Sequence, residues 1–169
     1  MLRLLRSLCR WCALLGGALF GVVVLVTVVN VGGFMLNAAA RPFDRTVPGL
    51  PGYEDAVSML VGLSALLMLP WCQLQRGHVS VDLFTSLLSA RARRLMTQVT
   101  DAIMGFLAAF LTVMMARGML GYRADGVRTP VLEWPIWPFM APGVLALALW
   151  AAVAFALAIA PEAADEDPR

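Results

Sequence analysis

Charge and titratable chemistry are scarce in this chain of 169 residues. Charged residues make up 14% of it and hydrophobic residues 60%, and the mean hydropathy is +0.79. A soluble domain carries about 25% charged residues. Lys is absent, so all 13 basic residues are Arg. These shortages exclude an ordinary soluble fold, and the net charge of +2 gives no indication of nucleic-acid binding.

The chain contains one histidine, His78. A lone histidine cannot build a metal site or supply both axial ligands of a haem, and no Ser or Cys lies in a pattern typical of a catalytic triad. Cys9 and Cys12 form a Cys-x-x-Cys spacing that redox and metal sites also use, but no second ligand pair follows, so we interpret them as reduced thiols. We therefore predict that the protein is not an enzyme and has no catalytic residue, metal or cofactor.

Four long apolar runs account for most of the sequence. Each is about the 20 residues that cross a hydrocarbon core, and a chain in lipid satisfies its backbone hydrogen bonds as a helix. A soluble bundle would need a polar face on each helix, which these runs lack. The sequence predicts an all-α membrane protein, one membrane domain over residues 1–169 with four transmembrane helices and a short acidic tail over 161–169. The expected spans are 11–36, 56–74, 96–115 and 136–160.

The arginines predict the orientation. Eight flank the spans on the side of the two termini (Arg3, Arg6, Arg10, Arg76, Arg91, Arg93, Arg94 and Arg169), and five lie on the other side (Arg41, Arg45, Arg117, Arg123 and Arg128). Because cytoplasmic loops carry the excess of basic residues, we expect both termini in the cytoplasm.

The connection between the second and third spans, residues 75–95, predicts an amphipathic interfacial helix. Phe84, Leu87 and Leu88 recur at helical spacing, and polar residues fall largely away from that stripe. Such a helix lies in the headgroup plane with its apolar side on membrane lipids. A brace against another protein is the alternative.

Two carboxylates open the second span. Glu54 and Asp55 face the positive end of a helix dipole, which is a structural role, and contact with a partner subunit is the functional alternative. Asp101 lies about a turn and a half into the third span. We expect it to pair with the nearby Arg91–Arg94 cluster or to meet water, rather than to act in a proton relay.

Small and aromatic residues supply the remaining candidates. Gly17 and Gly21 form a Gly-x-x-x-Gly pair in the first span, a spacing that permits close helix approach. Pro135 suits the entry to the fourth span, and Trp137 suits the membrane interface.

These features resemble the small membrane subunit of tripartite ATP-independent periplasmic (TRAP) transporters, the DctQ-like family. The resemblance covers roughly residues 10–155. Besides the order of four spans, it is carried by Arg76-Gly77-His78-Val79-Ser80-Val81-Asp82, by Thr129 and Pro135-Ile136-Trp137, by Pro142-Gly143, and by Glu54.

The resemblance implies an accessory role in the bacterial inner membrane. In that family a periplasmic solute-binding protein delivers an organic acid, and a large multi-span permease subunit moves it with a sodium gradient. The small subunit packs against and stabilises the large one. The resemblance therefore marks six residues as partner-interface or structural candidates: Glu54, Arg76, His78, Asp82, Pro135 and Trp137. The glycine spacing adds Gly17 and Gly21 to these candidates.

Two other functions remain open from the sequence. A self-sufficient small carrier of the multidrug-exporter type needs a membrane-embedded carboxylate in its first span, and this first span has none. A structural four-span membrane protein without a transport role is not separated from the accessory subunit by sequence alone.

Overall fold

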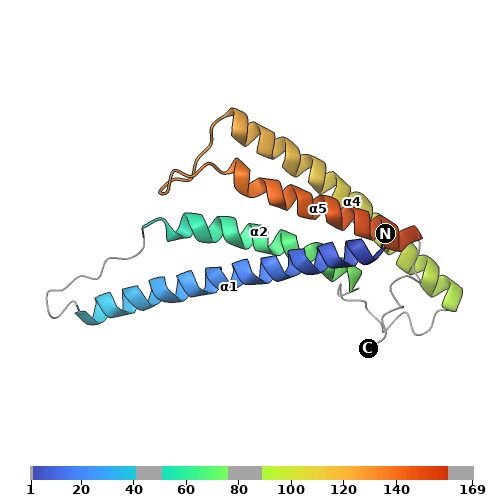
Figure 1. Cartoon of the computed structure of the whole chain (residues 1–169), viewed down its shortest axis with the longest axis horizontal. Coiled ribbons are helices and arrows are strands. Elements are labelled where there is room, and N and C mark those ends of the chain that lie inside the picture. Colours follow the sequence, from blue (N-terminus) through green and yellow to red (C-terminus); the bar gives the residue numbers. More distant parts are fainter. Residues whose placement is uncertain (1, 41–50, 76–88, 160–169) are drawn as a thin grey trace.

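The computed structural model describes residues 2–40, 51–75 and 89–159, which form four helices (Figure 1). They are α1 (Leu2–Ala40), α2 (Tyr53–Leu74), α4 (Ala90–Ala124) and α5 (Trp137–Ile159). Each is long and apolar enough to cross a membrane. The described residues include no strand, apart from an isolated antiparallel bridge between Arg128 and Pro135. The prediction of an all-α protein with four membrane-crossing helices is confirmed. Most of the predicted interfacial segment 75–95, with Phe84, Leu87 and Leu88, lies outside the described residues, whereas its residues 90–95 belong to α4.

The helices pack as two antiparallel pairs, α1 with α2 and α4 with α5, which meet where α2 packs on α5. α4 packs along α5, α1 packs along α2, and α2 also packs on α5, whereas α1 meets α5 at only a few positions. In Figure 1 the two pairs lie close at the end that holds the N-terminus and spread apart toward the α4–α5 connection. Only 11% of the most apolar stretch of α1 is buried inside the molecule, against 44% for α5. α1 is therefore the helix that offers the most surface.

Two of the helices exceed the membrane thickness. α1 has 39 residues and α4 has 35, whereas α2 has 22 and α5 has 23. At 1.5 Å per residue, α1 is about 58 Å long, roughly twice the hydrocarbon core. α4 starts after Ser89, whose hydroxyl accepts a hydrogen bond from the backbone N–H of Ala92 at 3.3 Å. Helices of this length must tilt or project beyond the bilayer.

The core lies along one face of α5. Leu147, Trp150 and Ala151 pack there against Ala108 of α4. Nearer the end of α5, a second cluster joins Cys9 of α1 to Val153 and Leu157. Lipid is as apolar as these side chains, so close packing rather than escape from water is what this core contributes to stability.

α1 contacts its neighbours through one narrow stripe. Its buried side chains, among those described, recur every seven residues, as in a coiled-coil seam: Cys9, Gly16, Val23 and Asn30. A Cβ added to Gly16 would lie 2.9 Å from the backbone oxygen of Ser64, so α1 and α2 approach closely there. Positions beside this stripe, such as Cys12, Leu19 and Val26, are half-buried, and the opposite side of α1 is exposed.

Candidate functional site

The α4–α5 connection is attached to the beginning of α2 by one carboxylate. Oδ2 of Asp55 accepts hydrogen bonds from the backbone N–H groups of Val131 at 2.8 Å and Leu132 at 2.9 Å. The position of Asp55 in the first turn of α2 also places its negative charge at the positive end of the helix dipole. Asp55 thus joins the helix pair α1–α2 to the pair α4–α5 at the end where the two pairs spread apart.

Gly52 allows this attachment because it has no side chain. Its φ of 77° is in the left-handed region, and a Cβ added there would lie 2.6 Å from Cγ of Leu132. A larger residue would meet both backbone strain and a collision. The turn before α2 is therefore shaped to receive the connection.

Internal hydrogen bonds define the conformation of the connection itself. Thr129 donates its backbone N–H to the carbonyl of Trp134 at 2.9 Å, and its hydroxyl accepts from the N–H of Trp134 at 3.0 Å. The guanidinium of Arg128 donates to the carbonyl of Glu133 at 3.3 Å. Glu133 itself has a φ of 53°, an uncommon conformation for a residue with a side chain. The segment is a folded unit rather than a simple link.

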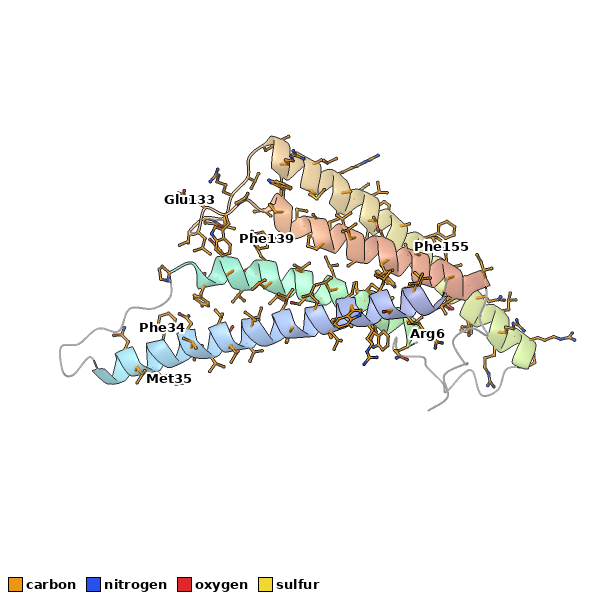
Figure 2. The ribbon with its side chains drawn as sticks, in the orientation of Figure 1. Arg6, Phe34, Met35, Glu133, Phe139 and Phe155 are labelled. Atoms are coloured by element: carbon orange, nitrogen blue, oxygen red, sulfur yellow. The ribbon has the colours of Figure 1, made fainter. Side chains whose placement is uncertain are left out.

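Aromatic side chains lie where the connection enters α5. The Trp134 ring stacks on Phe139 with centroids 5.9 Å apart, and Cζ of Arg123 lies 5.0 Å from the centroid of the Trp137 ring. Pro135 is exposed, directly before this point. Figure 2 shows Glu133 on the connection near the first turn of α2, and Phe139 on the side of α5 that faces α2. The structure thus gathers Pro135 and Trp137 at one end of the bundle with Asp55.

Glu54 does not take part in this attachment. Its side chain is exposed, and Oε1 accepts a hydrogen bond from the hydroxyl of Tyr53 at 3.3 Å. Of the two neighbouring carboxylates, Asp55 binds within the chain and Glu54 points outward. A role of Glu54 in contact with a partner stays a prediction.

A buried polar cluster joins three helices toward the opposite end. Nε2 of Gln73 in α2 donates to Oδ1 of Asp101 in α4 at 2.8 Å, and Nε1 of Trp150 in α5 donates to Oε1 of Gln73 at 3.1 Å. All three side chains are at least 95% buried. Polar groups buried between helices in this way fix their relative position, because any shift would break the bonds. The structure thus adds Gln73 to the partners expected for Asp101.

The glycine pair in α1 faces away from the rest of the chain. A Cβ added to Gly17 or Gly21 would meet no atom within 4 Å, whereas one added to Gly16 would collide with α2. Gly16 provides the close approach of helices inside this subunit, and a contact of Gly17 and Gly21 with a partner stays a prediction. Gly17 and Gly21 remain available to another molecule.

The remaining candidates, Arg76, His78 and Asp82, lie outside the described residues. Within the described ranges, no three His, Cys, Asp or Glu side chains are grouped so as to hold a metal ion. The clusters that the structure does build are bonds between helices.

A sequence model of one family matches most of the chain. The family is described as tripartite ATP-independent periplasmic transporters, DctQ component, and the match covers residues 31–161. The chain belongs to this family. The resemblance to the DctQ-like family that the residues indicated is confirmed. No curated protein and no solved structure matches the chain.

Membership sets the broad function. The DctQ component is the small permease component of a TRAP transporter, which works with a large permease and a solute-binding protein. It is a transporter component and not an enzyme family, and its four long apolar helices indicate a multi-pass protein of the inner membrane. The match begins inside α1, so Gly17 and Gly21 precede it whereas Asp55, Gln73, Asp101 and Trp150 lie within it.

The bonds that join the helices do not follow from the sequence. Gln73 carried a signal, as an amide at the end of an apolar run, and so did Trp150, because a buried indole N–H usually finds a partner. Nothing in the sequence showed that the two meet at Asp101. The spacing of seven residues that links Cys9, Gly16, Val23 and Asn30 is also present in the sequence, but it is less conspicuous than the Gly17–Gly21 spacing.

Proposed function

We propose that this DctQ component is an accessory subunit that packs against the large permease subunit and stabilises it. Transport by the complex is sodium-coupled uptake of an organic acid that the periplasmic solute-binding protein delivers. The family match supports the tripartite setting, and the features of the chain itself support the accessory role.

The observation that carries the proposal is the distribution of charge. Asp101 is the single Asp, Glu, Arg or His in the four apolar runs, and its carboxylate is buried against Gln73. Coordinating sodium or a carboxylate solute at the membrane midplane calls for polar side chains or broken helices that line a cavity. Here the buried groups Gln73, Asp101 and Trp150 instead bind one another between helices. The hydroxyls of Thr27, Ser64 and Thr112 donate to carbonyls of their own helices. Such a chain is suited to support a transport site that another subunit provides.

The open side of α1 supports a place for the large subunit. Among its described residues, α1 fully buries only Cys9, Gly16, Val23 and Asn30. Over the exposed glycines Gly17 and Gly21 a neighbouring helix can approach to backbone contact. We propose this side of α1 as the surface on which the large subunit packs. Glu54, Pro135 and Trp137 would extend the contact at the end where the connection lies.

For the segment between α2 and α4 we propose a second contact. His78 and Asp82 anchor the chain as it leaves α2, and Phe84, Leu87 and Leu88 are buried at the interface. His78→Ala or Asp82→Ala should lower assembly of the complex or the uptake rate without changing which solute is preferred. A changed preference would mean that this chain contacts the solute.

Reconstitution in liposomes with an imposed sodium gradient tests the proposal. The chain, the large subunit and the binding protein are added singly, in pairs and together, and uptake of radiolabelled organic acids is measured. We expect uptake only when all three proteins are present. The two membrane subunits should also co-purify at a fixed ratio. Uptake by this chain alone, at the rate of the full set, would overturn the accessory role.

A further inference from the structure

An apolar groove runs between α2 and the α4–α5 pair. It has a volume of about 170 Å³, is open on one side, and is lined by Met59, Gly62 and Leu66 of α2, Met115 of α4, and Phe139 and Met140 of α5. We refer to these six residues as the α2–α5 groove. It lies between the two attachments of the bundle, the one made by Asp55 and the one made by Gln73. Hydrogen bonds between the helix pairs therefore lie on either side of the groove.

The position of the α2–α5 groove determines what can fill it. Gly62 is nine residues into α2, about 14 Å from its beginning, so the groove lies in the part of the bundle that hydrocarbon surrounds. Its walls are apolar, and water gains no partners in an apolar cavity. Such walls suit a hydrocarbon group better than water.

The size of the α2–α5 groove excludes a helix. An α-helix with side chains is about 10–12 Å across, whereas a cavity of 150 Å³ holds about one benzene ring. A volume of about 170 Å³ fits a short length of a flexible chain. Lipid chains are the surrounding solvent at this depth, so they reach the groove without having to be recruited.

The rim of the α2–α5 groove suits a phospholipid headgroup. Trp137 comes one residue after the connection ends, next to the groove residues Phe139 and Met140, and the guanidinium of Arg123 lies 5.0 Å over its ring. Tryptophan settles at the level of the headgroups, and arginine there attracts phosphate. A cation thus stands at the end of α5 where a lipid phosphate would lie.

We propose that the α2–α5 groove binds an acyl chain of a phospholipid from the leaflet on the side of the α4–α5 connection, with its phosphate near Arg123. The lipid fills the space between the two helix pairs and so completes the packing of the subunit. The proposal does not depend on the large subunit.

A photoactivatable phospholipid tests this site in the full chain. The protein is reconstituted in vesicles of phosphatidylethanolamine with a smaller share of phosphatidylglycerol, and the probe carries a diazirine in its acyl chain. Bulk lipid will label every open apolar surface, such as Leu145, which is 72% exposed, and Phe110, which is 58% exposed. A bound lipid differs because it survives repeated detergent washing before illumination. After washing we expect labels on Met59, Met115 and Met140, and loss of labels on Leu145 and Phe110.

Two neighbouring variants separate filling of the groove from general damage. A Cβ on Gly62 meets no atom within 4 Å, so Gly62→Phe should place its ring in the groove and abolish the retained labels. Val61→Phe, at the same depth on an exposed position outside the groove, should keep them. Gly62→Leu gives the same readout if the Phe variant does not accumulate. Arg123→Gln should lower the retained labelling, because the phosphate loses its cation.

Three results would overturn the proposal. One is labelling of the α2–α5 groove that washes out in step with that of Leu145, which would mean contact with bulk lipid alone. The second is retention in Gly62→Phe and Gly62→Leu equal to that in the unmodified chain. The third is loss of the groove labels when the large subunit is present, with cross-links from that subunit in their place, which would make a partner side chain the occupant.

Discussion

Asp55 holds Leu132, a residue 77 positions away in the chain, through a 2.9 Å hydrogen bond from the Leu132 backbone N–H to the Asp55 carboxylate. The same oxygen binds the N–H of Val131. This one side chain therefore controls how the α4–α5 connection sits on α2.

Loss of the Asp55 carboxylate should release the connection. In Asp55→Ala the amides of Val131 and Leu132 lose their acceptor, so they should exchange with deuterium faster than in the unmodified protein. Asp55→Asn retains one side-chain oxygen as an acceptor, so its exchange rates should lie between those of the unmodified protein and Asp55→Ala. Glu54→Ala is the matched control, because the Glu54 side chain points outward and should leave both amides protected. Unchanged exchange in Asp55→Ala would contradict the attachment.

The Gln73 side chain should contribute to the stability of the fold through two hydrogen bonds. Gln73→Leu removes the donor to Asp101 and the acceptor of Trp150, and buried polar groups left without such a bond cost about 1–3 kcal/mol. We expect a loss of that size in the free energy of unfolding, measured by denaturation in mixed micelles. Gln75→Leu, at an exposed position two residues on, should cause little change.

A double variant gives a stricter measure of the Gln73–Asp101 bond. If the two side chains are coupled, Gln73→Leu with Asp101→Leu should lose less stability than the sum of the two single variants. Strict additivity would show that the bond contributes nothing.

Gly16 and Gly17 should respond oppositely to the same substitution. Gly16→Val forces a side chain against the Ser64 backbone and Cβ of Leu67, and overpacking of this kind costs about 1–3 kcal/mol. Gly17→Val meets nothing inside the subunit, so its stability in detergent should not change. If the large subunit packs on this side of α1, Gly17→Val should instead reduce co-purification of the two. Destabilisation of the isolated chain by Gly17→Val would contradict the placement of that face.

Two glycines with positive φ separate backbone strain from collision. Gly126→Ala, at a φ of 63° with open space around it, should cost about 1–2 kcal/mol for the left-handed conformation. Gly52→Ala has a similar φ but also places its Cβ against Leu132. The thermal midpoint should therefore fall further for Gly52→Ala. Equal losses in the two variants would mean that Leu132 yields freely.

Orientation is testable by labelling single cysteines in a chain whose native cysteines are replaced by Ala. The arginine distribution places the beginning of α4 in the cytoplasm and its end on the outer side. An impermeant thiol reagent added to intact cells should therefore label Ala124→Cys and spare Ser89→Cys, both at exposed positions. The reverse pattern would overturn the prediction that both termini are cytoplasmic.

The sequence identified several residues of the candidate site, but not which of them contact one another. Pro135 and Trp137 were identifiable as the entry to the fourth helix, and Glu54 and Asp55 as the opening of the second. Which of the two carboxylates binds the connection depends on a rotation of about 100° between neighbouring residues of a helix, and the sequence does not fix the facing direction. For the same reason the sequence does not show that Gly16 faces α2 whereas Gly17 and Gly21 face away from the rest of the chain.

Local composition determined the class of this protein. Runs of apolar residues without charge can satisfy their backbone in lipid only as helices, so four membrane-crossing helices followed from the sequence alone, and the motifs around them indicated the DctQ family. Contacts between residues far apart in the chain were decided only by the tertiary structure. The bonds of Asp55 to Val131 and Leu132, the cluster of Gln73, Asp101 and Trp150, and the groove between α2 and α5 each depend on how helices are rotated and paired. Hydropathy does not encode that rotation, because in lipid every face of such a helix is equally apolar until another helix packs on it.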